Sequence, residues 1–141
     1  GGQAVQGYHW FNLFLHILAA VLLYVLLCRA VDSAAAWMGA LVFLLHPTHA
    51  ELINYLSSRS DLMVSCWYLG GMLLAAQGRW AGTCAAYAGG LLSKEVAITL
   101  PLLAGIQRGW RQVKTLWRPF VVLGLVGLGY LALISLNRFL P

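Results

Sequence analysis

The sequence predicts an all-α fold, a polytopic bundle of transmembrane helices that includes short, broken ones. Hydrophobic residues make up 61% of the chain and charged residues only 9%, whereas soluble proteins average about 25% charged residues. Long apolar runs recur along the chain, and clusters of polar residues separate them. With so few polar side chains the chain could not cover a water-facing surface, so we expect lipid to surround most of it.

The apolar runs predict six membrane segments. A hydrocarbon core of about 30 Å needs about 20 helical residues. The run 80–107 is too long for one span and is interrupted by Ser93-Lys94-Glu95, so we expect two short helices there. The chain 1–141 is then one partial transmembrane domain. Its predicted segments are residues 8–28, 33–45, 62–77, 80–93, 96–107 and 120–136.

The basic residues predict how these segments are oriented. If residue 8 lies outside, Arg29, Arg79 and the basic cluster 108–118 all face the cytoplasm, as the positive-inside rule requires. A single helix over 80–107 would separate Arg79 from that cluster and bury Lys94 and Glu95 in mid-bilayer, at a cost of several kcal/mol. We therefore expect a multi-pass protein with both ends outside. The net charge of +5 is a topology signal, and no nucleic-acid partner is expected.

This topology gathers polar groups at the external, periplasmic or lumenal, face. The short segments that end near residues 46 and 94 span only about 20 Å each, so their polar ends are expected below the membrane surface. Polar backbone at that depth is tolerated where it lines a cavity. We therefore predict an outward recess and a set of candidate binding residues that comprises His9, His46, His49, Glu51, Arg59, Asp61, Lys94 and Glu95.

Residues 47–58 are expected to form an external amphipathic helix. Pro47 suits the first turn of a helix, because its missing N–H would be unpaired there in any case. One stripe of this helix, which would lie over the recess, then carries Glu51, Asn54, Tyr55 and Ser58. The alternative interpretation is a solvated connecting loop.

A metal site built from protein ligands alone is not expected. His46, His49 and Glu51 are suitable ligand types, but their spacing differs from the H-E-x-x-H motif of zinc proteases. A divalent cation stays open as a cofactor. The three cysteines are far apart and are read as packing residues.

The outward cations Arg59 and Lys94 break the positive-inside pattern, which suggests a local demand for positive charge. A lipid phosphate would supply that demand; the alternative is simple ion pairing with Asp61 and Glu95. As the next helical residue, Glu95 would point about 100° away from Lys94. The expected anion for Lys94 is therefore Glu51, Asp61 or a ligand phosphate.

Three polar residues share one face of the first predicted helix. His9, Asn12 and His16 are spaced at i, i+3 and i+7. Asn12 and His16 lie deep enough to need hydrogen bonds, and contacts to a neighbouring helix are the expected source. His9, at the external end, suits either such a contact or the recess.

Three blocks resemble, in order and spacing, the membrane part of GT-C glycosyltransferases. They are "YHWFNLFLHILAAVLLYVLL", "HPTHAELINYLSSRSDLMVSCWYLGGMLLA" and "GLLSKEVAITLPLL". The group with the closest likeness is the protein O-mannosyltransferase-like one with transmembrane and tetratricopeptide repeats. The resemblance covers nearly the whole chain, and the H-P-x-H-x-E and L-S-K-E blocks are its specific parts.

The resemblance implies transfer of a sugar, mannose in this group, from a polyprenyl-phosphate donor to an acceptor hydroxyl such as a protein Ser or Thr. It implies that Lys94 and Arg59 contact the donor phosphate, and that Glu51, His46 and His49 order the cavity near sugar or acceptor. The family's mechanism, an inverting transfer, makes Glu51 a candidate catalytic base. The family's chief catalytic acid would precede Tyr8, and no acidic residue stands before Asp32. We therefore expect half an active site here, and no activity from this fragment alone.

Two other classes of function stay open from the residues. Charged groups at the ends of short, broken membrane helices are also how transporters bind substrates and ions. A transporter or flippase fragment that binds an anionic substrate in an outward cavity is therefore the alternative. A structural membrane subunit is the third.

Overall fold

The computed structural model describes residues 2–47, 58–109 and 117–139. Every regular element in these ranges is a helix, and no strand occurs in them, so the predicted all-α class is confirmed. The elements are α1 (Gly2–Leu27), α2 (Ser33–Leu45), α4 (Arg59–Ala76), α5 (Trp80–Ser93), η2 (Glu95–Thr99), α6 (Leu100–Arg108) and α8 (Trp117–Phe139).

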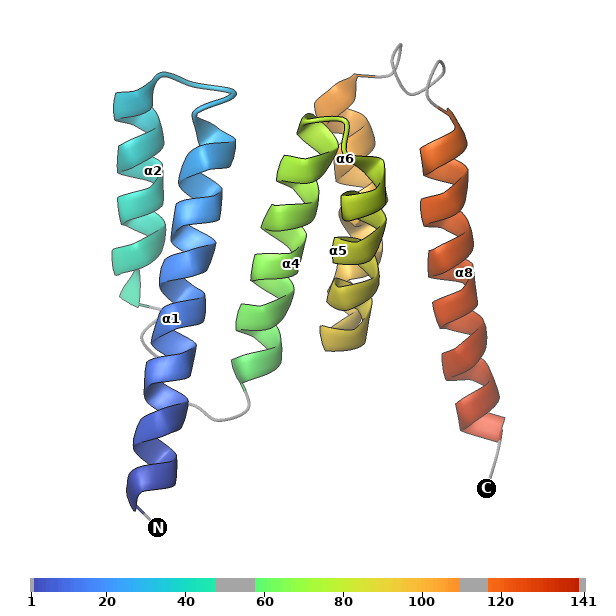
Figure 1. The fold of residues 1–141 in the computed structure, drawn as a ribbon, viewed down its shortest axis with the longest axis horizontal. Helices are drawn as coiled ribbons and strands as arrows, with labels where there is room; N and C mark the ends of the chain where they lie inside the picture. The colour runs from blue at the N-terminus through green and yellow to red at the C-terminus, as the bar shows by residue number, and fades with distance from the viewer. Residues whose placement is uncertain (1, 48–57, 110–116, 140–141) are drawn as a thin grey trace.

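The helices run alternately up and down in one row (Figure 1). Helices α1 and α2 form an antiparallel hairpin on one side, and α4 and α5 form a second hairpin in the middle. The chain then turns at the far end of α5 and returns through η2 and α6, which lie behind α5. Helix α8 runs down the other side, so the N- and C-termini lie at the same end of the bundle (Figure 1).

Local signals explain most helix boundaries. The Asp32 carboxylate caps α2, because its Oδ1 accepts the N–H of Ala35 at 3.0 Å. Helix α4 starts at Arg59, three residues before the predicted segment, and Asp61 in its first turn suits the positive end of the helix dipole. Glycines with positive φ stand where α4 turns into α5 (Gly78, φ 76°) and where α6 ends (Gly109, φ 79°).

The structure breaks the run 80–107 at Lys94, where two short helices were expected to meet, but the second is not uniform. Residues 95–99 form a 3₁₀ helix, and the α-helix begins only at Leu100. Pro101 explains this change, because proline has no N–H to bond to the preceding turn and is tolerated only in the first turn of an α-helix.

Small residues allow α4, α5 and η2 to pack closely. A Cβ added at Gly71 would lie 3.4 Å from the Cβ of Ala86, and one added at Gly90 would lie 2.9 Å from the Cβ of Ala97. Small residues at such interfaces let helix backbones approach each other in the membrane. The side chains buried around this contact include Tyr87, Leu91, Ala97, Leu100 and Leu123.

Polar contacts join α1 to its two neighbours. The imidazole Nε2 of His16 donates to the Leu44 carbonyl of α2 at 3.1 Å, and the ring stacks on Phe43 with centroids 5.3 Å apart. On the other side, the Cys66 thiol of α4 donates to the Leu15 carbonyl at 3.3 Å. His16 is 1% exposed, so it provides the helix–helix hydrogen bond that was expected of it.

The outer surface is apolar enough to face lipid. Segments Gly7–Leu27 and Trp117–Asn137 are long and apolar enough to cross a membrane, and α2 is a shorter apolar helix. Large apolar side chains on these helices are open, including Trp10 at 72% and Leu133 at 68% exposure. Exposing such a surface to water costs free energy, whereas exposing it to the hydrocarbon of a membrane does not.

Arginines mark one end of the bundle. Arg29 follows α1, Arg79 lies between α4 and α5, Arg108 ends α6 and Arg118 lies in the first turn of α8. The helix ends that carry these arginines lie at the end of the bundle opposite both termini (Figure 1). We call this the arginine-rich end. Arg108 donates from Nε and Nη2 to the Ala75 carbonyl at 3.0 and 2.5 Å and lies 5.5 Å from the Trp80 ring centroid, so it fastens α6 to the α4–α5 turn.

Cysteine labelling tests the orientation that these arginines suggest. In the full-length protein, with the native cysteines replaced, a cysteine at Ser93 is expected to react with an impermeant maleimide added outside. One at Gln77, which is exposed in the α4–α5 turn, should react only after permeabilisation, because the positive-inside rule predicts that the arginine-rich end faces the cytoplasm. External labelling at Gln77 would contradict this orientation.

Candidate functional site

The candidate site is built around Lys94, at the end of the bundle opposite the arginine-rich end. Lys94 is not helical: its φ of −163° and ψ of 145° are extended, and its N–H bonds back to the Gly90 carbonyl at 2.8 Å. The chain reverses at this residue, between α5 and η2. Lys94 therefore stands at a fixed break in the helix.

Asp61 is the anion that Lys94 contacts. The Lys94 ammonium forms an ion pair with Oδ1 of Asp61, which lies in the first turn of α4. Of the three anions expected from the sequence, Asp61 is thus the one found beside Lys94; Glu51 lies outside the described residues. The two side chains are 44% and 36% exposed, and exposed pairs of this kind stabilise a fold by only about 0–1 kcal/mol.

Arg59 brings a second cation to the same turn of α4. Its guanidinium carbon lies 4.6 Å from the ring centroid of Tyr8 on α1, a cation–π contact. Arg59 and Asp61 are separated by one residue at the start of α4. The start of α4 therefore links α1, through Tyr8, to the break that carries Lys94.

The helices that end near this site are shorter than α1 and α8. Helix α5 has 14 residues and α2 has 13, which correspond to about 20 Å each, whereas the 26 residues of α1 reach about 39 Å. In Figure 1 both α1 and α8 extend beyond the lower ends of α2 and α5. Lys94, at the end of α5, therefore stops short of the ends of α1 and α8 along the bundle, and it lines a cavity there.

Two cavities lie on either side of the break. One, of about 450 Å³, has mixed polar and apolar walls and reaches helix α8; its lining residues are Leu91, Leu92, Ser93, Lys94, Glu95, Val96 and Tyr130. The other, of about 300 Å³, is lined by residues of α2, α4 and η2: Phe43, Val64, Ser65, Tyr68, Leu69, Val96 and Thr99. Val96 contributes to both, so the break segment is the wall between them.

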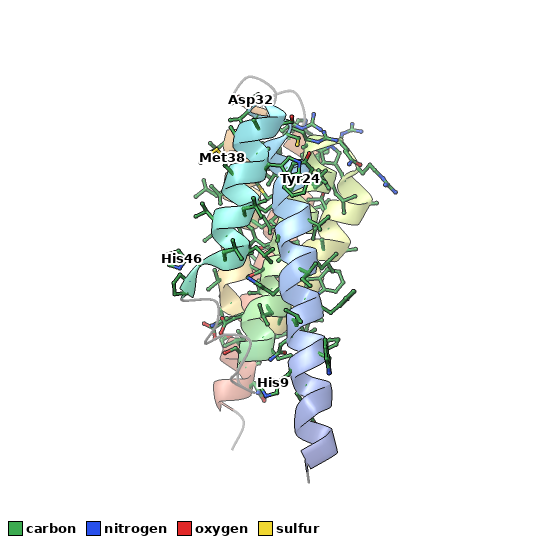
Figure 2. All side chains as sticks on the ribbon, turned by 90° about the vertical axis from the view of Figure 1, so that its left-hand side faces the viewer. His9, Tyr24, Asp32, Met38 and His46 are labelled. Carbon is green, nitrogen blue, oxygen red and sulfur yellow. The ribbon has the colours of Figure 1, made fainter. Side chains whose placement is uncertain are left out.

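The structure brings together only part of the predicted set. Arg59, Asp61 and Lys94 gather as described, and Glu95 follows Lys94 as the first residue of η2. His9 is half-buried on α1, and His46 caps the exposed end of α2. Figure 2 shows His46 and His9 progressively further from Asp32, toward the Lys94 end. His49, Glu51 and most of the predicted amphipathic helix 47–58 lie outside the described residues.

Two aromatic residues of the site were not predicted from the sequence. Tyr8 was taken only as the start of the first span, yet its ring supports Arg59. Tyr130, on α8, lines the larger cavity. Tyr130 lies in an apolar helix in which no periodic pattern marks the inward face. Tyr8 stands four residues before Asn12, on the polar face of the first helix, so the spacing carried a signal for Tyr8 that was not used.

No metal-binding cluster is present in the part of the chain that the structure describes. Within residues 2–47, 58–109 and 117–139, no three His, Cys, Asp or Glu side chains lie close enough together to hold an ion. The chemistry visible in this part of the site is therefore that of two cations and two carboxylates. Cations of this kind suit a phosphate, and carboxylates suit hydroxyl groups.

Comparison with known proteins gives one match. The chain is 32% identical over 114 residues to the protein O-mannosyl-transferase Tmtc1 of Drosophila melanogaster. The match covers 75% of this chain and 13% of that protein, so the chain spans about an eighth of the length of this relative. No family model matches the chain, and no solved structure matches it significantly.

Proposed function

We propose that this chain is part of a multi-pass membrane glycosyltransferase of the GT-C type. The full-length protein would transfer mannose from a polyprenyl-phosphate donor to a Ser or Thr hydroxyl of an acceptor protein, at the extracytoplasmic or lumenal face. The similarity to Tmtc1 supports the reaction class. The observation that carries the proposal is Lys94, a cation fixed at a helix break in a recess and held by one exposed carboxylate.

The geometry around Lys94 suits the phosphate of such a donor. An ammonium has three N–H donors, of which the described residues use one, in the pair with Asp61, so the other two can bind a phosphate oxygen. Because the exposed pair contributes little stability, a phosphate can share or replace Asp61 at low cost. Arg59, placed by Tyr8 at the same turn of α4, adds a planar guanidinium that can bind phosphate oxygens in a bidentate manner.

The expected reaction is an inverting transfer. The acceptor hydroxyl attacks the anomeric carbon, a carboxylate takes the hydroxyl proton, and the bond between that carbon and the phosphate oxygen breaks. Lys94 and Arg59 would stabilise the charge that develops on the departing lipid phosphate. We assign no base among the described residues; Glu51 keeps the candidate role that the sequence suggested.

The test is an assay of the full-length protein in detergent. Incubation with polyprenyl-phosphate mannose and a Ser/Thr-rich acceptor protein is expected to attach mannose to the acceptor, detected by mass spectrometry. A protein that binds the donor, leaves every acceptor unmodified and moves the lipid across vesicle membranes would instead be a transporter, and the proposal would fail. Omission of the acceptor is the control for hydrolysis of the donor.

A further inference from the structure

Two polar groups in the larger cavity have no partner among the described residues. Within those residues, Glu95 forms no ion pair or hydrogen bond, and the Tyr130 hydroxyl forms none either. The other polar side chains of the cavity are engaged, since Ser93 donates to the Gly89 carbonyl at 2.9 Å and Lys94 pairs with Asp61. The cavity therefore offers a carboxylate and a phenol to a ligand.

We propose that Glu95 and Tyr130 bind the sugar ring of the lipid-linked donor, an inference that rests on the function proposed above. The Glu95 carboxylate accepts hydrogen bonds from sugar hydroxyls, and the Tyr130 hydroxyl donates to or accepts from another. Leu91, Leu92 and Val96 supply the apolar part of this mixed pocket, against which the carbon face of a sugar ring can pack.

The covalent structure of the donor places its sugar next to Lys94. In such a donor a single oxygen joins the anomeric carbon to the phosphate. When the Lys94 ammonium binds the phosphate, the sugar ring must therefore lie directly beside that ammonium. Lys94 and Glu95 are consecutive residues that line the same cavity, so this cavity is within reach of a sugar attached to that phosphate.

The second cavity is a poorer site for a sugar. None of the described residues that line it is charged, and their hydroxyls are already engaged: the Tyr68 and Thr99 hydroxyls bond to each other at 3.0 Å, and Ser65 donates to the Asp61 carbonyl at 2.7 Å. A sugar moved there from water would leave hydroxyls without partners, which costs free energy. The Glu95 side is therefore the favoured one.

Binding of two lipids to the full-length protein in detergent tests the inference. The probes are polyprenyl-phosphate mannose and bare polyprenyl phosphate, which differ by the sugar. Glu95→Gln is expected to weaken binding of the mannose-bearing lipid about tenfold, the effect of losing one charge-assisted hydrogen bond. Binding of the bare lipid should be unchanged. Tyr130→Phe, which keeps the ring, should act in the same direction by a smaller factor.

The controls separate this inference from the function on which it rests. Asp32→Asn removes the same charge at the arginine-rich end and can still cap α2, so it should leave both affinities unchanged. Equal loss for both lipids, or no loss for either, in folded Glu95→Gln would overturn the sugar site and leave the transferase proposal intact. If the wild-type protein binds neither lipid, both the sugar site and the proposed transferase function are contradicted. If Glu95→Gln does not fold, unchanged binding by Tyr130→Phe overturns the sugar site.

Discussion

Replacement of Lys94 by alanine in the full-length protein is expected to lower sugar transfer at least about 100-fold, with little loss of folded protein. This loss of rate is the one expected when the transition state loses one positioned hydrogen-bond donor. Here the donor is the ammonium that stabilises the negative charge developing on the departing phosphate. The small effect on folding follows from the exposure of the Lys94–Asp61 pair, because pairs of this kind contribute only about 0–1 kcal/mol.

Three variants make the Lys94 result specific. Lys94→Arg should restore transfer only partly, since a planar guanidinium differs in shape from a compact ammonium. Arg79→Ala removes a positive charge at the arginine-rich end, where its side chain caps no helix, and should leave transfer unchanged. Asp61→Asn breaks the same ion pair while the ammonium stays in place, so it should reduce transfer much less than Lys94→Ala.

The comparison of Lys94 with Asp61 decides between the two roles. If Lys94 serves only to pair with Asp61, the two single variants should behave alike, with similar losses of thermal stability and similar transfer. Full transfer by a well-folded Lys94→Ala variant would refute the phosphate role. Transfer from the polyprenyl-phosphate donor and the unfolding midpoint in detergent are the measurements.

The break at Lys94 could be predicted from the sequence because the evidence for it is local. A Lys-Glu pair within an apolar run is too costly at the bilayer centre, so the run had to divide there. The 3₁₀ geometry of residues 95–99 was missed, although Pro101 carries the signal for it. Its fixed φ and missing N–H restrict where an α-helix can begin, and this restriction was not applied to the second helix.

The partner of Lys94 could not be chosen in the same way. The argument rested on Glu95 as the next helical residue, whereas Lys94 has an extended backbone. The contact with Asp61 depends on how the start of α4 lies against the end of α5, which no spacing along the chain encodes. The sequence therefore left three candidate anions for Lys94, and the packing of α4 and α5 places Asp61 beside it.

The contribution of α8 to the site could not be predicted from the sequence either. Its residues are apolar all round, so hydrophobic periodicity does not show which face turns inward. Tyr130 enters the site because α8 packs beside the cavity at the break. The expectation that His16 bonds to a neighbouring helix succeeded for a simpler reason, since a buried imidazole needs a partner wherever it points.

Substitution of Gly90 is expected to have the second large effect, because Gly90 contacts both Lys94 and η2 and so determines the position of Lys94. Its carbonyl accepts the Lys94 N–H at 2.8 Å, and a Cβ added to it would lie 2.9 Å from the Cβ of Ala97 in η2. Ala97 is fully buried, and its N–H donates to the Lys94 carbonyl at 3.2 Å. The atom in the way is attached directly to a packed backbone, so it cannot move aside as the tip of a long side chain could.

Gly90→Leu is therefore expected to destabilise the full-length protein by about 3 kcal/mol or more, the upper part of the range for overpacking, and to abolish donor binding with it. The leucine side chain has to displace η2 from α5. This displacement moves Lys94 away from Asp61 and disrupts the segment that separates the two cavities. Gly124→Leu is the matched control, because nothing lies within 4 Å of a Cβ at that position on α8. Leucine stabilises a helix relative to glycine by up to about 1 kcal/mol, so this variant should be no less stable than the wild type. Thermal unfolding and binding of polyprenyl-phosphate mannose in detergent are the two readouts. Wild-type stability and binding in Gly90→Leu, beside an unaffected Gly124→Leu, would show that η2 does not pack on α5 as the placement of Lys94 requires.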